Sequence, residues 1–570
     1  MAKNLTTGLQ RGLRQSIAGG LGTGDLFSTA ALDLQFARHK SLDSRVTHTR
    51  QSSATYVDGD GVIRTAVTNL LLRSEEFDNA YWSKGGTITA NDALSPVGTQ
   101  SADKLAGGTS NYITRQIADA LVGASYTFSV WLKSANPGQP ATLRLNLSAP
   151  QATPNSSQSV TTTNEWRRYS VTVASVTSVN LYSQIGEWGT NGWGPSADVH
   201  VWGAQLEESS TAGQYVKTTS AINSAPRFDH DPETGESLGL LVEESRQNLL
   251  TYSEEFNNAS WNLVDGGVAS SPVVTANQAI APNGTLTADE VYFALNGGTT
   301  SSDLSQLSQT ESITNGITYA ASIYAKTVDG STKIISFVHP TGATENISVT
   351  GEWRRYSIIA TATSSISSSF RLRLRGGAST SDAAGIYLWG SQLEAGSFPT
   401  SYIPTEGSTV TRAADVASIT GTNFSSWYRQ SEGTVFADSQ RPFTITSGFQ
   451  RIFSINDGSG NNETNILWGS ASSKFYSAII SGGAASADIG FFSQTQTISQ
   501  RGVVGYKVDS FGFTANGQVP ATDTLGPVPV SVNRLEVGQF SSAGQFNGTI
   551  RRLTYWPTRL SNDTLQTITR

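Results

Sequence analysis

Two tryptophans in a glycine-rich segment are the side chains of this sequence best suited to binding chemistry. Trp188 and Trp193 lie within residues 186–194, a segment that also contains four glycines. An exposed indole ring can stack on the apolar face of a pyranose, while nearby Asn, Asp and Gln side chains bond to its hydroxyl groups. The alternative is that the two rings fill a core or an intersubunit contact. We therefore treat Trp188 and Trp193 as candidate glycan-binding residues.

No arrangement of residues in the sequence points to catalysis. The five histidines have no ligand spacing, and they are His39, His48, His200, His230 and His339. The acid–histidine cluster at 229–231 lies in a connector with turn chemistry. Spacing alone selects no pair of carboxylates for a glycosidase. The sequence therefore predicts a protein that is not an enzyme.

Composition narrows the class of protein. The net charge is −7, only 15% of residues are charged and there is no cysteine. Without a dense Lys/Arg run, capture of a phosphate backbone is disfavoured, so no nucleic-acid partner is expected. No apolar run approaches the roughly 18 to 20 residues that a membrane span needs, and the start lacks a secretory signal, so we expect a soluble protein without membrane insertion. Abundant Gly, Ser, Thr and Asn favour short strands joined by turns, an all-β fold.

Several blocks of sequence occur twice. The pairs are 69–77 with 248–256, 126–133 with 319–326, 165–170 with 352–357, and 202–207 with 389–394. The spacing between blocks varies by a few residues, as loop insertions between fixed strands would produce. Apolar residues alternate within 126–133, which indicates a strand with one buried face. We expect the tryptophans shared by both copies to be core residues: Trp82, Trp166 and Trp202 with Trp261, Trp353 and Trp389.

The duplication defines tandem β-sandwich modules and the segments around them. We predict modules at 69–220 and 248–405, a small β base domain of 32–68 plus 221–247, a linker at 406–430 and a β-rich C-terminal domain at 431–570. Residues 1–31 form an N-terminal arm or anchor. Leucines at four-residue spacing predict a short amphipathic helix within 4–20, either frayed or docked on a partner. Ser561 is a predicted N-cap for a short terminal helix.

The motifs of these modules resemble known families. Each repeat opens with Asn-Leu-Leu, an acidic-Phe pair and a Trp, and the first repeat has a Tyr-x-Phe-Ser-x-Trp strand at 126–131. This pattern resembles the galactose-binding-like jelly rolls, especially carbohydrate-binding modules. The stretch 532–566, with Val-Asn-Arg-Leu-Glu-Val-Gly and Gly-Thr-Ile-Arg-Arg-Leu-Thr-Tyr-Trp-Pro, resembles a concanavalin-A-like, laminin-G-type jelly roll.

The order of the pieces, together with the motifs at 47–61 and 226–232, is similar to structural proteins of tailed bacteriophages that are described as tail or fibre proteins. In those chains the first motif runs directly into the second. The first jelly roll is therefore expected to be an insertion between Val67 and Ala221, so that 32–66 and 221–247 pack together.

The resemblance implies a virion structural component, a tail fibre or tail-associated protein that presents glycan-binding modules for host recognition. Its partners would be other virion proteins, a host cell-surface glycan and further copies in a homotrimer, after synthesis in the host bacterial cytoplasm. No cofactor is expected except a structural calcium, for which Glu75 and Glu254 are candidate ligands by analogy with related jelly rolls. The alternatives are a capsid or tail decoration with mainly protein–protein roles, and a polysaccharide depolymerase.

Overall fold

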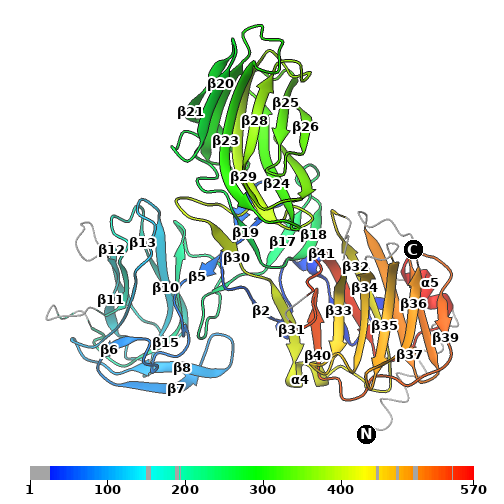
Figure 1. Cartoon of the computed structure of the whole chain (residues 1–570). Coiled ribbons are helices and arrows are strands. Elements are labelled where there is room, and N and C mark those ends of the chain that lie inside the picture. The colour runs from blue at the N-terminus through cyan, green and yellow to red at the C-terminus, as the bar shows by residue number, and fades with distance from the viewer. Residues whose placement is uncertain are drawn as a thin grey trace. The chain divides into compact units, whose positions relative to one another are not determined.

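The computed structural model describes residues 26–148, 156–186, 192, 194–443, 448–469, 474–491, 499–541 and 544–570. These residues form strands, turns and a few short helices (Figure 1). The chain divides into two compact units. The insert unit comprises Thr49–Ser53 and Thr65–Ala225, and the main unit comprises Ala54–Arg64, Pro226–Arg570 and the described residues up to His48. The predicted all-β, multi-domain sandwich architecture is confirmed.

The insert unit contains the first jelly roll, in which two five-stranded antiparallel sheets enclose a core that includes Phe128 and Leu145. The sheet orders are β12-β11-β14-β9-β6 and β13-β10-β15-β8-β7, and β5 pairs separately with β16. The strands of this unit are β5 (Thr68–Asn69), β6 (Ser83–Gly85), β7 (Ile88–Leu94), β8 (Gln100–Leu105), β9 (Tyr112–Ile117), β10 (Tyr126–Ser134), β11 (Thr142–Ser148), β12 (Ser156–Thr161), β13 (Arg167–Val173), β14 (Leu181–Ile185), β15 (Val199–Glu208) and β16 (Asn223–Ser224).

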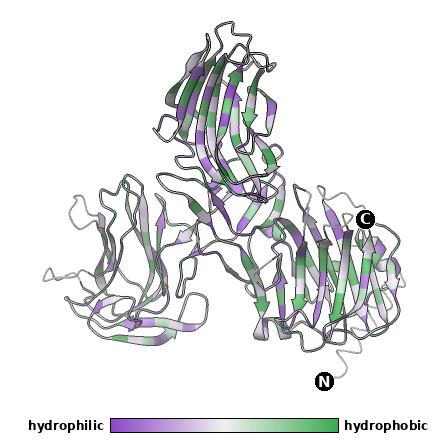
Figure 2. Ribbon diagram, in the orientation of Figure 1, coloured by the Kyte–Doolittle hydropathy of each residue, from purple (hydrophilic) through white to green (hydrophobic). Residues whose placement is uncertain are grey.

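The main unit contains the second jelly roll, built on the same plan around a core that includes Phe337 and Leu372. Its sheets have the orders β20-β23-β28-β25-β26 and β21-β22-β29-β24-β27. Its strands are β20 (Asn262–Gly266), β21 (Ser270–Ile280), β22 (Leu286–Ala294), β23 (Leu304–Ile313), β24 (Thr318–Thr327), β25 (Lys333–Val338), β26 (Thr344–Val349), β27 (Arg354–Thr361), β28 (Ile366–Arg375) and β29 (Ala383–Ala395). Figure 2 shows hydrophobic and hydrophilic positions alternating along many strands, as a sandwich with one buried face per sheet requires.

The C-terminal part of the main unit is a larger sandwich of an eight-stranded and a seven-stranded sheet. The first contains β1 (Leu32–Leu34), β17 (Arg227–His230), β18 (Ser237–Val242), β32 (Glu432–Gln440), β37 (Gln500–Lys507), β38 (Ser510–Ala515), β39 (Ala521–Asp523) and β41 (Gly548–Trp556). The second contains β2 (Thr47–Thr49), β31 (Val416–Thr420), β33 (Phe449–Asn456), β34 (Glu463–Gly469), β35 (Lys474–Ser481), β36 (Ala484–Phe491) and β40 (Arg534–Val537).

Short elements complete the main unit. They are α3 (Phe36–His39), β3 (Thr55–Val57) paired with β4 (Ile63–Thr65), β19 (Arg246–Asn248) paired with β30 (Val410–Arg412), α4 (Gly421–Ser425) and α5 (Asn562–Ile568). The predicted N-cap of the terminal helix is confirmed, since the Ser561 hydroxyl accepts a hydrogen bond from the backbone N–H of Thr564 at 3.2 Å. None of the helices in the described ranges has the length and apolar character needed to cross a bilayer.

The segments 32–68 and 221–247 differ from the expected small base domain. Strand β17 pairs with β18, β18 pairs with β41, and β1 also pairs with β41, so these strands extend the C-terminal sandwich. The expected packing between the two segments is present in the main unit, where the Val57 N–H donates to Asp229 at 2.7 Å. A few strands of three to six residues cannot enclose a core of their own, and joining a larger sheet buries their apolar faces.

Most of the N-terminal arm, including the predicted helix within 4–20, lies outside the described residues. The described part begins at Leu26, which is buried in a cluster with Phe436 and Trp556. The Trp556 indole N–H donates to the Leu26 carbonyl at 3.1 Å. The end of the arm is therefore fixed to the C-terminal sandwich.

A buried asparagine explains why both repeats begin with Asn-Leu-Leu. The Asn248 amide donates to the carbonyls of Ser391 and Ile403 at 3.0 and 2.9 Å. Its oxygen accepts from the N–H groups of Leu250 and Leu393 at 3.2 and 3.1 Å. Asn69 makes the corresponding four bonds in the first jelly roll. In each copy, one side chain satisfies four buried backbone groups and ties the first segment to the last strand.

The Trp-Gly-x-Gln-Leu-Glu motif marks a β-bulge. The pairing register of β24 with β29 shifts between Ser322 and Tyr324, opposite Gly390, and β10 with β15 shifts opposite Gly203. Both glycines have positive φ, 64° for Gly390 and 67° for Gly203. A side chain at Gly390 would also press against Tyr324. Glycine therefore recurs here because the backbone of the bulge requires it.

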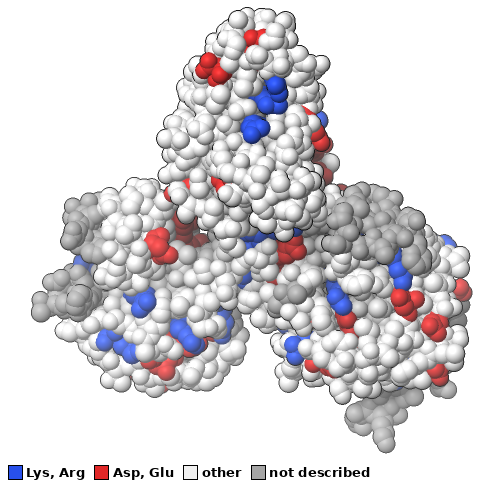
Figure 3. All heavy atoms as spheres, in the orientation of Figure 1, with Lys and Arg blue, Asp and Glu red and all other residues white. Residues whose placement is uncertain are grey.

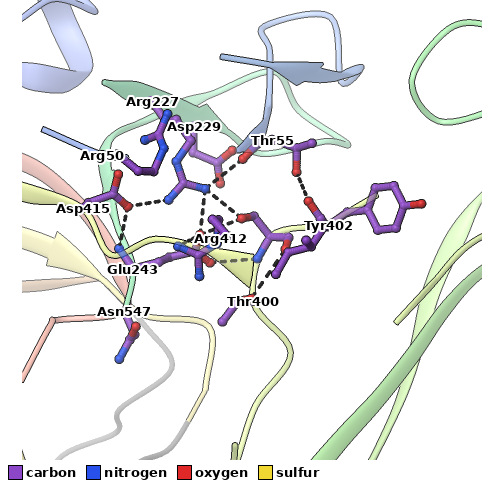
Figure 4. Close-up of polar contacts among 12 residues, drawn as sticks. Arg50, Thr55, Arg227, Asp229, Glu243, Thr400, Tyr402, Arg412, Asp415 and Asn547 are labelled. Atoms are coloured by element: carbon purple, nitrogen blue, oxygen red, sulfur yellow. Dashed lines mark hydrogen bonds and ion pairs between the residues drawn. The ribbon is translucent and has the colours of Figure 1, made fainter. Parts of the chain in front are cut away.

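A buried ionic network joins the connector before the second jelly roll to the chain that follows it (Figure 4). Arg227 contacts Asp415 at 2.5 Å and Glu243 at 2.7 Å, and Arg412 lies 3.6 Å from Glu243. All four side chains are buried. Burial alone would raise the pKa of Glu243, but the Arg412 and Arg227 guanidinium groups lower it to about 2. The two acids and two bases thus compensate one another away from water.

Candidate functional site

The candidate glycan-binding residues Trp188 and Trp193 lie outside the described residues, so their role stays a prediction. The described chain before them ends at Gly186, directly after β14. Strand β14 is the central strand of the sheet β12-β11-β14-β9-β6.

The candidate calcium ligands Glu75 and Glu254 both have protein partners, and their role as calcium ligands stays a prediction. Tyr215 donates to Glu75 at 3.1 Å, and the Lys217 ammonium lies 2.6 Å from the same carboxylate. Glu254 accepts from the Trp389 indole at 2.8 Å and from a tyrosine hydroxyl at 3.0 Å. Within the described ranges, no group of three or more His, Cys, Asp or Glu side chains is placed to hold a metal ion. Both carboxylates act as hydrogen-bond acceptors within their jelly rolls.

The tryptophans shared by both repeats divide into two kinds. The four buried ones are Trp82, Trp202, Trp261 and Trp389. Trp166 and Trp353 differ from the core expectation, because each is only partly buried. Their indole N–H groups donate to the carbonyls of Leu94 and Ile280, both at 3.0 Å, and the ammonium of Lys326 lies 5.2 Å from the Trp353 ring. These hydrogen bonds attach the Trp166 and Trp353 rings to a neighbouring β-hairpin at the surface.

The acid–histidine cluster at 229–231 is part of the fold of the main unit. Asp229 accepts from the Val57 N–H, and the His230 Nδ1 lies 3.1 Å from the Val57 carbonyl. Burial raises the pKa of Asp229 to about 6. These contacts hold β3 against β17, so the cluster has a structural explanation.

A row of polar residues crosses the outer face of one sheet of the second jelly roll. Strand pairing places Asn346 opposite Ser336, Ser336 opposite Arg373, and Arg373 opposite Gln306. Residues directly opposite in antiparallel strands share a face of the sheet. Their inward neighbours, such as Leu372, belong to the core, so the row faces outward. On this face Asn346 is exposed and Arg373 is partly buried, whereas Ser336 and Gln306 are buried between them and their neighbours.

The central strand of this sheet, β28, carries three arginines on that outer face. Arg371, Arg373 and Arg375 alternate with Leu372 and Leu374, which are buried. Arg375 donates through Nε to the Ser301 carbonyl at 2.9 Å. Burial and then the charges of Arg375 and Arg371 lower the pKa of Arg373. We call these three residues the arginine row.

A groove of about 510 Å³ lies at one end of the arginine row. Its lining consists of Ser301, Ser336, Thr344, Asn346, Arg373, Arg375 and residues 376–378. Within it, Ser336 donates to the Asn346 amide oxygen at 2.7 Å. This volume lies within the range of roughly 300 to 1,000 Å³ typical of small-ligand sites. The groove is large enough for a sugar unit and is lined mainly by hydrogen-bonding groups.

The first jelly roll has the corresponding row with different chemistry. Here Ser157 pairs with Asn146, Asn146 with Gln184, and Gln184 with Thr114. Gln184 lies on the central strand β14, as Arg373 lies on β28. The outward residue before Gln184 is Tyr182. The two rows share their geometry, but the described row of the first jelly roll has no charged member.

Sequence reasoning did not identify these faces. The alternation of Arg371–Arg375 was a visible signal for a strand with one polar face. Its importance depends on β28 being the central strand and on which residues lie opposite, and pairing register is not contained in the periodicity of one strand. The aromatic residues of the sequence point to the Trp188 and Trp193 segment and not to these faces.

Comparisons with known proteins give low similarity. No protein-family model matches the sequence, and no curated protein matches it. The chain is similar over 26% of its length to the carbohydrate-binding module CBM40 of the Ruminococcus gnavus IT-sialidase (16% identity, 88% of that chain, TM-score 0.23). It is similar over 58% of its length to the tandem CBM22 modules of Paenibacillus barcinonensis Xyn10C (14% identity, 98% of that chain, TM-score 0.25).

A further similarity covers 52% of the chain and 95% of domains LG4-5 of the mouse laminin alpha1 chain (10% identity, TM-score 0.18). These three similar structures are two sets of carbohydrate-binding modules and a pair of laminin G domains. At these identities and TM-scores the likenesses assign no function.

Proposed function

We propose that the two jelly rolls bind glycans on the outer faces of the sheets that carry the polar rows. The observation that carries this proposal is the row Asn346, Ser336, Arg373 and Gln306, which runs across four strands beside a groove. Sugar hydroxyl groups both donate and accept hydrogen bonds, and amide, hydroxyl and guanidinium groups in a fixed array match them. A sheet holds such an array with little loss of side-chain freedom.

The chain as a whole is proposed to be a structural component of a tailed-bacteriophage virion, a tail fibre or tail-associated protein without enzymatic activity. The sequence motifs at 47–61 and 226–232 support this role. The protein would be made in the host bacterial cytoplasm, assemble as a homotrimer with other virion proteins, and contact a host cell-surface glycan. Several weak sites on one particle would act together, because linking them raises the effective concentration of each.

A glycan microarray probed with the full-length chain tests glycan binding. We expect binding that weakens on Asn346→Ala, while Thr361→Ala keeps wild-type binding, since Thr361 is an exposed residue of the opposite sheet. Absence of binding to every glycan, or equal loss in both variants, would contradict the proposal. Mass spectrometry of purified particles, with antibody labelling of the tail, tests the virion location.

One observation favours the alternative role of binding neighbouring proteins. The β21–β22 hairpin at the edge of its sheet exposes apolar side chains, with Val273 opposite Tyr292 and Ile280 opposite Leu286. Exposed apolar groups on an edge hairpin are suited to protein contacts. If Val273→Lys and Leu286→Lys abolished incorporation into particles but left glycan binding unchanged, the hairpin would be an assembly surface.

A further inference from the structure

The two jelly rolls differ in charge at equivalent positions. Strands β14 and β28 are both central in their sheets, and their outward residues are Tyr182 and Gln184 in one copy and Arg371 and Arg373 in the other. A duplicated fold needs the same core in both copies, and the inward residues of both strands are accordingly apolar or small. The outward positions are under no such packing requirement, so their difference reflects what each face contacts.

The arginine row has no internal counter-charge. Among the described residues, no carboxylate forms an ion pair with Arg371 or Arg373, although ion pairs are formed elsewhere in the same jelly roll, as between Lys333 and Asp329. The Nε of Arg373 is buried and has no hydrogen-bond partner in the structure. The Nε atoms of Arg227 and Arg412 in the buried ionic network also have no partner, so the lack of an ion pair among the described residues is what distinguishes Arg373 from them.

Spacing along the strand makes the row a single cationic site. Alternate residues of an antiparallel strand are about 6.8 Å apart, and the charges of Arg375 and Arg371 lower the pKa of Arg373, so the guanidinium groups repel one another. A ligand anion placed between them would relieve this repulsion. Figure 3 shows Lys and Arg atoms close together on the visible face of the second jelly roll, the uppermost part of the view.

We propose that the second jelly roll selects glycans that carry an anionic group, a carboxylate or a sulfate, through Arg371 and Arg373. This inference rests on the proposed glycan binding. The planar guanidinium fork binds such oxyanions with two parallel hydrogen bonds. The neighbouring exposed Asn346 contacts the sugar hydroxyl groups, and the first jelly roll, with Gln184 in place of Arg373, takes neutral sugars.

The test uses the full-length chain on an array of oligogalacturonates, sulfated and neutral malto-oligosaccharides, and bacterial surface polysaccharides before and after reduction of their carboxyl groups. We expect preferential binding to anionic probes, weakening with salt, and the response to carboxyl reduction separates carboxylate from sulfate. Arg373→Gln should weaken this binding roughly 10- to 100-fold, the loss expected for a hydrogen bond to a charged group.

Arg354→Gln is the matched control, because Arg354 is an exposed arginine on the opposite sheet. It removes the same charge and should keep wild-type affinity. Unchanged thermal midpoints for both variants exclude misfolding. The reciprocal change, Gln184→Arg, should add anionic binding to the first jelly roll.

The outcomes separate the two proposals. Equal binding of anionic and neutral probes with no effect of Arg373→Gln would overturn the anionic selectivity and leave glycan binding standing. Equal weakening by Arg373→Gln and Arg354→Gln would show non-specific charge attraction and would also overturn it. Failure of the wild-type chain to bind any probe would overturn glycan binding itself.

Discussion

Arg373 and Gln184 occupy the same position in the two jelly rolls, on the central strand of a five-stranded sheet and opposite an outward polar residue of the next strand. That partner is Ser336 for Arg373 and Asn146 for Gln184. The scaffold is thus repeated while the chemistry of its outer face changes. Under the proposed function, the two outer faces would therefore differ in the sugars that they bind.

The buried asparagine of each repeat should be essential for the stability of its jelly roll. Asn248→Ala would leave two carbonyl and two N–H groups without partners, at a cost of about 2 to 4 kcal/mol. Calorimetry of the full chain should show a lower unfolding temperature for one transition. Asn315→Ala, at an exposed turn, should change nothing. Equal behaviour of the two variants would refute this role.

Arg227 should be the least replaceable member of the buried ionic network. Arg227→Met leaves Asp415 and Glu243 without their shared partner, which costs about 3 to 5 kcal/mol when a buried pair is broken on one side. Chemical unfolding measures the loss, with Arg354→Met as an exposed control. A cost below about 1 kcal/mol would mean that water reaches the network.

The same network makes the stability of the folded chain depend on pH. The folded pKa of Glu243, about 2, lies below its ordinary value of 4.5. The contribution of the ionised Glu243 to the free energy of unfolding is therefore complete above pH 4.5 and is lost as the pH falls toward 2. Unfolding followed from pH 5 to pH 2 should show this loss in the wild type and a smaller one in Glu243→Gln, measured relative to each protein at pH 5.

His339 should cause a separate loss of stability at mildly acidic pH. Burial lowers the pKa of His339 to about 4 from 6.5, so the unfolded chain binds the proton more readily than the folded one. Stability is therefore lost as the pH falls from 6.5 to 4, by up to about 3 kcal/mol. His339→Asn keeps an acceptor for Thr341 and should remove this dependence, whereas the exposed His39→Asn should not. The same pH profile in all three proteins would contradict the assignment.

Removal of divalent metal should leave the jelly rolls intact. The carboxylates of Glu75 and Glu254 are already engaged by Tyr215, Lys217 and Trp389. We expect no change of the unfolding temperature on addition of a chelator. A fall of several degrees, restored by calcium, would show that the calcium predicted from sequence is present.

The sequence predicted the sandwich modules well because a duplication separates framework from loops. Asn69 and Asn248, and Gly203 and Gly390, recur because backbone geometry demands them. The strands around 227–242 were harder to place, since their pairing with β41 joins residues some 300 positions apart, and a local pattern carries no information about such a partner. Trp166 and Trp353 recur like core residues, yet they bond to a surface hairpin. For the candidate site, the sequence shows that polar and apolar residues alternate along β28. It does not show that β28 is the central strand of its sheet.

A crystal structure of the full chain with an oligosaccharide selected on the array tests the central claim most directly. We predict sugar density on the outer face of the sheet β20-β23-β28-β25-β26, with an anionic group between Arg371 and Arg373 and hydroxyl groups near Asn346. Sugar bound elsewhere on the described surface, with the arginine row unoccupied, would contradict it.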